Sequence, residues 1–211
     1  MLKHSIAITT TAHSFAVSSM LGVIPMEFDL IYADPSWLFK TYSDKGQGRA
    51  PKYPPMTLED LAKIEVAEIR KKNCVLFLWV TWPHLHNGMD LMSAWGFSYR
   101  TNAWTWVKNR MAKGYYTRKK TEVCLIGARG SVPVAVKDED DLIFADVRAH
   151  IQKPDDAYVK MSRLYPNAQY PDRLELFASE YSMHTARNYG FIPVGFDVDG
   201  KDIRDAVRDL K

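Results

Sequence analysis

The feature that most constrains this chain is a set of short, nearly uninterrupted apolar runs separated by segments with helical patterning. Such runs are typical of strands that are buried on both faces of a sheet. Strands that alternate with helices predict an α/β fold with a mostly parallel sheet and helices on both faces. The predicted strands are FDLIYAD (28–34), CVLFLWV (74–80), SYRTNAWTWVK (98–108), EVCLIGA (122–128), DLIFADV (141–147) and RLELFAS (173–179).

The intervening segments carry helix start and stop signals. Thr57, followed three residues later by Asp60, predicts an N-cap. Pro83 and Gly96 bracket a second helix, with proline at its start and glycine past its end. Pro154 opens a third helix with two aspartates in its first turn, where the helix dipole favours carboxylates. A short helix is expected near the C-terminus.

The length of 211 residues and an ordinary globular composition predict one domain over residues 1–211. Residues 1–26 contain interrupted apolar stretches, so we interpret them as an extra strand or extension rather than as a secretory signal. No run approaches the roughly 18 apolar residues of a membrane helix. Cys74 and Cys124 lack metal-binding neighbours, so we expect buried thiols, no metal and a cytoplasmic location.

The net charge of +3 hides a local basic segment. Residues 100–129 carry eight lysines and arginines and a single acid, Glu122, interleaved with aromatic residues. This pattern is typical of a surface that binds a polyanion with stackable bases. The alternative interpretation is a solvated loop with scattered lysines. The candidate nucleic-acid contacts in this segment are Lys108, Arg110, Tyr115, Arg118, Lys119 and Lys120.

Several common motifs are absent from the sequence. No GxGxxG follows a predicted strand, and neither a phosphate-binding lysine loop nor a GxSxG motif occurs. His84 and His86 are two positions apart and so do not share a helix face, and we interpret both as surface histidines.

The residues at the end of the first strand form the main candidate site. Asp34 would project into the crevice where α/β proteins bind ligands, and Pro35 stiffens the turn after it. A carboxylate, a carbonyl and the ring of Trp37 together suit the exocyclic amino group of a stacked base. Taken alone, these four residues are equally compatible with a helix cap and a core tryptophan.

The Asp34-Pro35-Ser36-Trp37 sequence resembles the DPPW signature of the N6-adenine methyltransferases of the MT-A70-like family. The resemblance continues in order over about residues 27–180. The further blocks are YPPMTLEDL (53–61), LFLWVTWPHL (76–85), WGFSYRTNAWTWVK (95–108), GYYTRKKTEVCLIGARG (114–130), KPDDAY (153–158) and LELFAS (174–179).

This resemblance implies S-adenosylmethionine as cofactor and a Rossmann-like methyltransferase fold in which the catalytic motif precedes the main cofactor-binding elements. It implies that Asp34 and the Pro35 carbonyl accept hydrogen bonds from adenine N6, with Ser36 in the same catalytic turn. It also implies that Trp37 flanks the base and that Tyr53 forms a second wall. The residues that it implies around the cofactor are Asp34, Lys153, Glu175, Leu176, Phe177 and Asp197.

The chain departs from the family pattern at several positions. Ser36 replaces a proline, so the Pro35 carbonyl is less rigidly aimed. Ser179 replaces an arginine that would contact the cofactor. In the divergent tail, residues 181–211, Phe196 stands where an asparagine is usual, although Asp197 could still accept from ribose hydroxyls.

The expected function is therefore methyl transfer to adenine N6 in nucleic acid, with DNA favoured over RNA because the chain is compact and carries no added RNA-binding module. A homodimer or heterodimer is possible, and no membrane association is expected. One alternative is a pseudo-methyltransferase that binds nucleic acid or supports an active partner. A second alternative is a basic α/β protein of another kind.

Overall fold

A computed structural model of the chain describes residues 25–38, 55–112, 116–149 and 151–211. The N-terminal extension that we predicted, and the candidate residues Tyr53 and Tyr115, lie outside these described residues.

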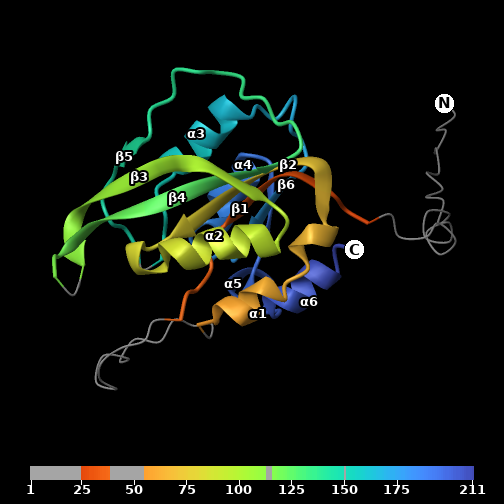
Figure 1. The fold of residues 1–211 in the computed structure, drawn as a ribbon, viewed down its shortest axis with the longest axis horizontal. Helices are drawn as coiled ribbons and strands as arrows, with labels where there is room; N and C mark the ends of the chain where they lie inside the picture. Colours follow the sequence, from red (N-terminus) through yellow and green to blue (C-terminus); the bar gives the residue numbers. More distant parts are fainter. Residues whose placement is uncertain (1–24, 39–54, 113–115, 150) are drawn as a thin grey trace, which may run out of the picture.

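One twisted sheet forms the centre of the molecule (Figure 1). Its strands lie in the order β5-β3-β4-β2-β1-β6-β7. Their bounds are β1 (Phe28–Ala33), β2 (Arg70–Val80), β3 (Ser98–Ala112), β4 (Lys119–Arg129), β5 (Leu142–Phe144), β6 (Arg173–Leu176) and β7 (Phe191–Val194).

The sheet is mostly parallel, as the sequence predicted, with one exception. β1 pairs in parallel with β2 and β6, β6 with β7, and β3 with β5. Only β4 runs in the opposite direction, because it pairs antiparallel with both β2 and β3. As a result, the start of β4 lies at the same edge of the sheet as the carboxyl ends of the other strands.

Helices cover both faces of the sheet, which confirms the predicted layers. On one face, α1 (Leu58–Ala62), α2 (Leu85–Ala94) and α6 (Ile203–Arg208) pack over a core that includes Leu61, Leu91 and Val207. On the other face, α3 (Asp156–Leu164) and α4 (Met183–Asn188) pack over a second core that is rich in aromatic rings. A short α5 (Phe196–Asp199) follows β7.

The helix signals in the sequence were accurate at their main positions. Thr57 caps α1 by accepting a hydrogen bond from the Asp60 backbone N–H. Pro83 lies in a 3₁₀ turn (Trp82–His84) that leads into α2, and Gly96 follows the helix with a φ of 78°, as expected for a residue past a C-cap. Pro154 lies just ahead of α3, in whose first turn Asp156 stands.

Several elements, among them the short α5, escaped the sequence analysis. β7 has four residues and contains Pro193, which argues against a central strand. The structure accommodates this proline because β7 is an edge strand, whose outer side needs no ladder hydrogen bonds. The short helix α4 was also not predicted. Conversely, β5 has three residues where seven were expected.

Both cysteines are free and buried, as predicted. Among the described residues, no helix is long and apolar enough to cross a membrane.

The start of β6 is held by a buried arginine. Arg173 is only 1% exposed, and its guanidinium donates to the backbone carbonyls of Tyr170 and Tyr189 at 2.9 and 3.3 Å, and to the carbonyl of Tyr165. It also donates to the hydroxyl of Ser162 at 3.1 Å. A single side chain thus joins β6 to α3 and to the segment before β7, and so fixes the strand that carries Glu175.

We expect Arg173→Met to lower the free energy of unfolding by about 3 kcal/mol, because it leaves several buried carbonyls without donors. Urea denaturation followed by circular dichroism measures this loss. Arg129→Met, at an exposed position of β4, is the matched control and should change stability by less than about 0.5 kcal/mol. Equal effects of the two substitutions would contradict this role of Arg173.

Candidate active site

The candidate site lies at the carboxyl edge of the sheet. Asp34 follows the last residue of β1, and its backbone N–H donates to the Leu176 carbonyl of β6 at 3.4 Å. Its carboxylate oxygen Oδ2 lies 2.5 Å from Nζ of Lys153, a residue 119 positions further along the chain. The structure therefore brings together two of the residues that the sequence singled out.

The Asp34–Lys153 pair belongs to a larger cluster of charges. Nζ of Lys153 also lies 3.6 Å from Oε2 of Glu122, and Glu122 pairs in turn with Lys108. All four side chains are largely shielded from solvent, with exposed fractions between 13% and 26%. Glu122 was missed as a site residue, although it was the only acid in the basic segment, and that isolation was the available signal.

In both Asp34 and Glu122, burial and ion pairing shift the pKa of the carboxyl group in opposite directions. Burial raises the pKa of Asp34 above its ordinary value, and the attraction of Lys153 only partly opposes this. Burial also pushes the pKa of Glu122 upward, but Lys153 and Lys108 outweigh it, so the net shift is downward. Lys153 is therefore the cation that limits the cost of ionising Asp34 in a partly buried site.

The turn that delivers Lys153 is held by an arginine. Arg148 makes a bidentate pair with Asp155 at 2.8 and 2.9 Å, and it donates to the backbone carbonyl of Lys153 at 2.9 Å. Within this turn Ile151 has a φ of 68°, a left-handed conformation that a β-branched residue rarely adopts. The amine of Lys153 also lies 5.4 Å from the centroid of the Trp79 ring.

Pro35 and Ser36 are tied by backbone hydrogen bonds. The Pro35 carbonyl accepts from the Trp37 N–H at 3.0 Å, which uses one of its two lone pairs. The Ser36 carbonyl accepts from the Met56 N–H at 2.8 Å. These bonds fix the turn without the second proline of the family signature.

Trp37 is placed differently from the expectation that its ring flanks a base. It is only 6% exposed, it belongs to the core, and its ring stacks on His84 with centroids 5.4 Å apart. Its indole N–H donates to the Trp79 carbonyl at 3.2 Å. The contacts of Trp37 therefore hold the Asp34 turn against β2.

The interpretation of His84 as a surface residue was wrong, whereas His86 is exposed as expected. His84 is 9% exposed, and its Nε2 lies 3.2 Å from the Leu38 carbonyl while its Nδ1 lies 2.9 Å from the Thr81 hydroxyl. Burial lowers the pKa of His84, which favours a neutral ring that donates to Leu38 from Nε2. The spacing of the two histidines did not reveal this, because His84 is buried by contacts with Trp37 and Leu38, which are distant in the sequence.

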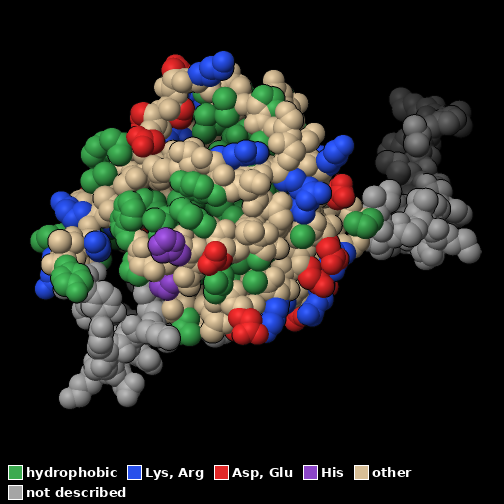
Figure 2. Space-filling view, in the orientation of Figure 1, with side chains coloured by type: hydrophobic (Ala, Val, Ile, Leu, Met, Phe, Trp, Pro, Cys, Tyr) green, Lys and Arg blue, Asp and Glu red, His purple; other side chains and the backbone are tan. Residues whose placement is uncertain are grey.

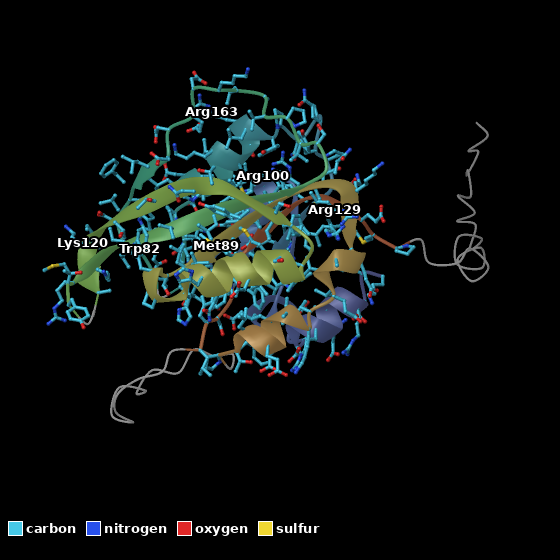
Figure 3. The ribbon with its side chains drawn as sticks, viewed as in Figure 1. Trp82, Met89, Arg100, Lys120, Arg129 and Arg163 are labelled. Atoms are coloured by element: carbon cyan, nitrogen blue, oxygen red, sulfur yellow. The ribbon has the colours of Figure 1, made fainter. Side chains whose placement is uncertain are left out.

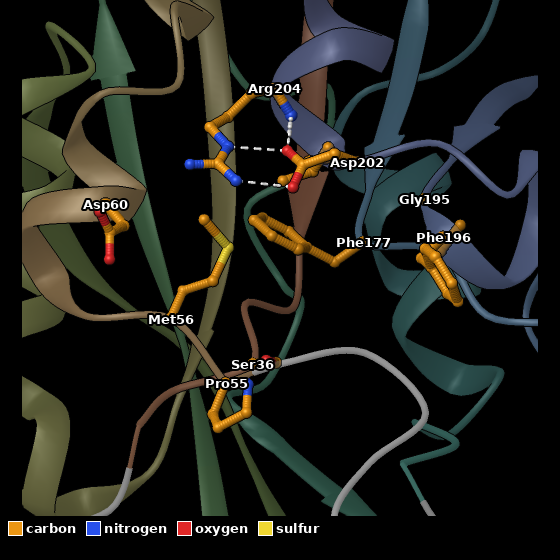
Figure 4. Close-up of a pocket in the computed structure, with 11 residues that line it drawn as sticks. Ser36, Pro55, Met56, Asp60, Phe177, Gly195, Phe196, Asp202 and Arg204 are labelled. Atoms are coloured by element: carbon orange, nitrogen blue, oxygen red, sulfur yellow. Dashed lines mark hydrogen bonds and ion pairs between the residues drawn. The ribbon is translucent and has the colours of Figure 1, made fainter.

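Two cavities share Phe177, and they are lined by different residues of the Asp34 turn: Ser36 in the larger one and Asp34 in the smaller one. The larger one, about 240 Å³, is lined by Ser36, Met56, Phe177, Gly195, Phe196 and Arg204 among others, and Figure 4 shows these side chains around it. The smaller one, about 20 Å³, is lined by Asp34, Lys153, Tyr158, Glu175, Phe177 and Ser179 among others. Phe177 has a φ of 63°, so the backbone is strained at the residue that both cavities share.

The larger cavity has an apolar lining with a charged border. Asp202 and Arg204 form a bidentate pair at 2.7 and 2.8 Å beside it. Gly195 contributes bare backbone there, because an added Cβ would lie 2.7 Å from the Ala178 carbonyl oxygen. Phe196, which stands where the family pattern has an asparagine, thus places an aromatic ring at this cavity, and 47% of the residue is exposed.

The smaller cavity is polar and acidic. Glu175 is 4% exposed, burial raises its pKa to about 7, and its Oε2 accepts from the Tyr158 hydroxyl at 2.7 Å. The hydroxyl of Ser179 accepts from the Ser182 N–H at 3.3 Å. The side chain of Ser179 therefore stabilises the turn after β6. It does not supply the cation that an arginine would place there.

Two residues that the resemblance implied at the cofactor site lie away from both cavities. The side chain of Leu176 is fully buried in the core between the sheet and α1, α2 and α6. Asp197 is half-buried in α5 and does not line either of these two cavities. Strand alternation explains Leu176, since its side chain points to the opposite face from that of Glu175.

The basic candidates fall into two groups. The Lys108 amine is 13% exposed, pairs with Glu122 and lies 4.4 Å from the centroid of the Trp106 ring, so it belongs to the charge cluster and not to the open surface. Arg110, Arg118 and Lys120 are exposed, and Lys119 is half-buried, on the β3–β4 hairpin, which extends beyond the helices in Figure 1. Figure 2 shows Lys and Arg side chains at the same end of the molecule.

The fold and these cavities at the carboxyl edge define an α/β protein of the methyltransferase class, and comparison with known sequences identifies the family. The MT-A70 profile matches residues 28–190. The chain therefore belongs to the MT-A70 family of S-adenosylmethionine-dependent methyltransferases.

The relatives found by sequence comparison differ in length. The chain is 29% identical over 171 residues to the type II methyltransferase M.MunI from a Mycoplasma species, covering 72% of each chain. It is 27% identical to an MT-A70-like N6-adenosine-methyltransferase from Arabidopsis thaliana, covering 82% of this chain and 24% of that one. It is 28% identical to the METTL3 subunit of the N6-adenosine-methyltransferase from Danio rerio, covering 89% of this chain and 30% of that one.

The residues around the two cavities fit the family's cofactor. The carboxyl groups of Asp34 and Glu175 suit a cationic sulfonium or ammonium group, and Lys153 suits a carboxylate. The rings of Phe177 and Phe196 suit an adenine. The larger cavity, about 240 Å³, approaches the roughly 300–1,000 Å³ of most ligand sites, and the smaller one adds only about 20 Å³.

We expect Lys153→Met to destabilise the fold by about 2 kcal/mol at pH 8 and by less at pH 4. At pH 8 Asp34 and Glu122 are ionised, so the substitution leaves two buried negative charges without their shared cation. At pH 4 the carboxyl groups of the variant take up protons, so the loss of the cation costs less stability. Urea unfolding at both pH values measures the difference. Lys201→Met, which breaks an exposed pair with Asp209, is the control, and a loss that is the same at both pH values would contradict this assignment.

Proposed function

We propose that this chain transfers a methyl group from S-adenosylmethionine to the N6 amino group of adenine in nucleic acid, with DNA as the preferred substrate. The observation that carries the proposal is the Asp34–Lys153 pair beside the Pro35 carbonyl at the carboxyl edge of the sheet. The relatives named as N6-adenosine methyltransferases and as a type II methyltransferase support it.

The acceptors at this turn have capacity left for a substrate. A carboxylate offers about four lone-pair positions, so Asp34 can accept from Lys153 and from an amino group at the same time. The Pro35 carbonyl has one lone pair beyond its bond to Trp37. Together they can hold both N–H groups of adenine N6.

The two acceptors can compensate for the weak nucleophilicity of adenine N6. The lone pair of adenine N6 is delocalised into the ring, which makes the nitrogen a weak nucleophile. Two fixed acceptors favour a pyramidal nitrogen and fix the direction of its lone pair, so that orientation lowers the barrier. The proton that N6 loses can pass to Asp34, whose raised pKa suits a group that holds a proton.

When bound, S-adenosylmethionine supplies an electrophilic methyl group on sulfur. We propose that the methionine part lies in the smaller cavity against Lys153 and Glu175, and the adenosine part in the larger cavity between Phe177 and Phe196. Phe196 then contributes ring stacking where the family pattern has the hydrogen bonds of an asparagine.

We favour DNA because the type II methyltransferase from the Mycoplasma species matches this chain at 29% identity over 171 residues. An adenine inside a duplex cannot reach the Asp34 turn, so the base must be flipped out or lie in a single strand. The basic β3–β4 hairpin at the same edge would contact the phosphates.

Incubation of the protein with labelled S-adenosylmethionine and matched DNA and RNA oligonucleotides tests the proposal. We expect N6-methyladenine by mass spectrometry, with faster labelling of DNA. Binding of nucleic acid without any methyl transfer would favour the pseudo-methyltransferase alternative, and faster labelling of RNA would overturn the preference for DNA.

We expect Asp34→Asn to lower the rate of methyl transfer by at least about 100-fold, since an amide NH₂ donates where the reaction needs an acceptor. Single-turnover labelling measures the rate, and oligonucleotide binding should remain. Asp29→Asn is a matched control. Asp29 also pairs with a lysine, but it lies at the start of β1, whereas Asp34 follows the end of that strand. A comparable loss in the control would point to a folding defect instead.

We expect the double reversal Lys119→Glu and Lys120→Glu to weaken oligonucleotide binding and to flatten its salt dependence. The slope of log K against log[salt] should fall in magnitude by about 1.4–1.8, the contribution of two phosphate contacts. Fluorescence anisotropy over a salt series measures it. The control, Lys72→Glu with Arg129→Glu, reverses two exposed charges at the amino edge and should change the slope little.

A further inference from the structure

Trp82 is an exposed aromatic residue whose orientation is fixed. It follows the carboxyl end of β2 and remains 41% exposed. Its indole N–H donates to the hydroxyl of Thr121 on β4 at 2.8 Å, so the polar edge of the ring is satisfied within the protein. What the ring offers to a ligand is therefore its apolar face.

The position of Trp82 relates it to the candidate active site. Val80 pairs with Val123 across β2 and β4, which sets the end of β2 beside the start of β4. Thr121 directly precedes Glu122, the carboxylate that shares Lys153 with Asp34. Because neighbouring residues of a strand point to opposite faces, Trp82 lies at the same edge of the sheet as the charge cluster but on the other face of β4.

The surroundings of Trp82 are cationic. Its partner Thr121 follows Arg118, Lys119 and Lys120 on the hairpin, and Figure 3 shows Trp82 and Lys120 at the same end of the sheet. An exposed ring next to a row of cations is the combination with which proteins bind single-stranded nucleic acid, because bases stack on the ring and phosphates meet the cations.

Tyr116 lies on the same hairpin and is also exposed, whereas two other exposed aromatic residues lack this combination. Tyr99 is 42% exposed at the start of β3, which lies at the amino edge of the sheet, away from the Asp34 turn. Phe144 is 75% exposed on the edge strand β5 and has no polar group that could fix its orientation. Single exposed apolar residues are common on protein surfaces and need no ligand.

We propose that Trp82 stacks on the nucleobase next to the target adenine. This inference rests on the proposed function, and it adds a binding residue that specifies an unpaired neighbouring base. When an adenine leaves its stack, the adjacent base loses a stacking partner, and the indole of Trp82 replaces that partner.

Binding of short fluorescent single-stranded DNA that contains one adenine tests the proposal. Two further oligonucleotides carry an abasic site on the 5′ or the 3′ side of that adenine. We expect Trp82→Ala to weaken binding of the intact oligonucleotide by about 5- to 100-fold. One abasic oligonucleotide should bind equally to the wild-type protein and to Trp82→Ala, because the base that Trp82 stacks on is already missing.

Further variants separate stacking from folding. Trp82→Phe should keep most of the affinity, since the smaller ring can still stack. Thr121→Val should lose affinity to an intermediate extent, because the indole remains but its orientation is no longer fixed. Tyr99→Ala, the matched control, should bind like the wild-type protein.

The proposal is overturned if Trp82→Ala weakens all three oligonucleotides by the same factor, or if it changes the oligomeric state and leaves DNA binding intact. If the wild-type protein neither binds nor methylates any nucleic acid, the proposed function fails together with this inference. If wild-type protein and Trp82→Ala bind and methylate equally well, only the stacking role of Trp82 fails.

Discussion

The contact between Asp34 and Lys153 is the interaction on which the rest of the site depends. A carboxylate and an ammonium group that leave water lose solvation, and only a close partner offsets that loss. Each group therefore constrains the segment that carries the other, across 119 residues of sequence. The Arg148–Asp155 pair fixes the turn around Lys153, and the bonds of Trp37 fix the turn around Asp34.

The reversed direction of β4 enlarges this pair into a cluster. Because β4 starts at the edge where the other strands end, it brings Glu122 to Lys153 and Lys108 to Glu122. The same reversal places the exposed cations of the β3–β4 hairpin at the same edge of the sheet as the candidate site. One feature of strand topology thus provides both the charge cluster and the surface that we propose for phosphates.

The departures from the family signature have structural counterparts. The turn around Ser36 keeps its shape through the Ser36–Met56 backbone bond, so a second proline is not needed for it. Ser179 bonds within its own turn, and Phe196 adds a ring to the larger cavity. In the cofactor site that we propose, Phe196 offers apolar contact in place of hydrogen bonding, while Asp34, Pro35 and Lys153 keep their types.

The sequence by itself determined the local features: the apolar runs that became strands, the Thr57 cap, the Asp34 turn and the family resemblance. Each depends on residues close together in the chain, which periodicity and turn chemistry reveal. Only the tertiary structure decided that β4 is reversed, that Lys108 pairs with Glu122, and that Trp37 and His84 stack inside the core. Those outcomes depend on which distant segments share a surface, and burial then sets the charge state and exposure of each side chain.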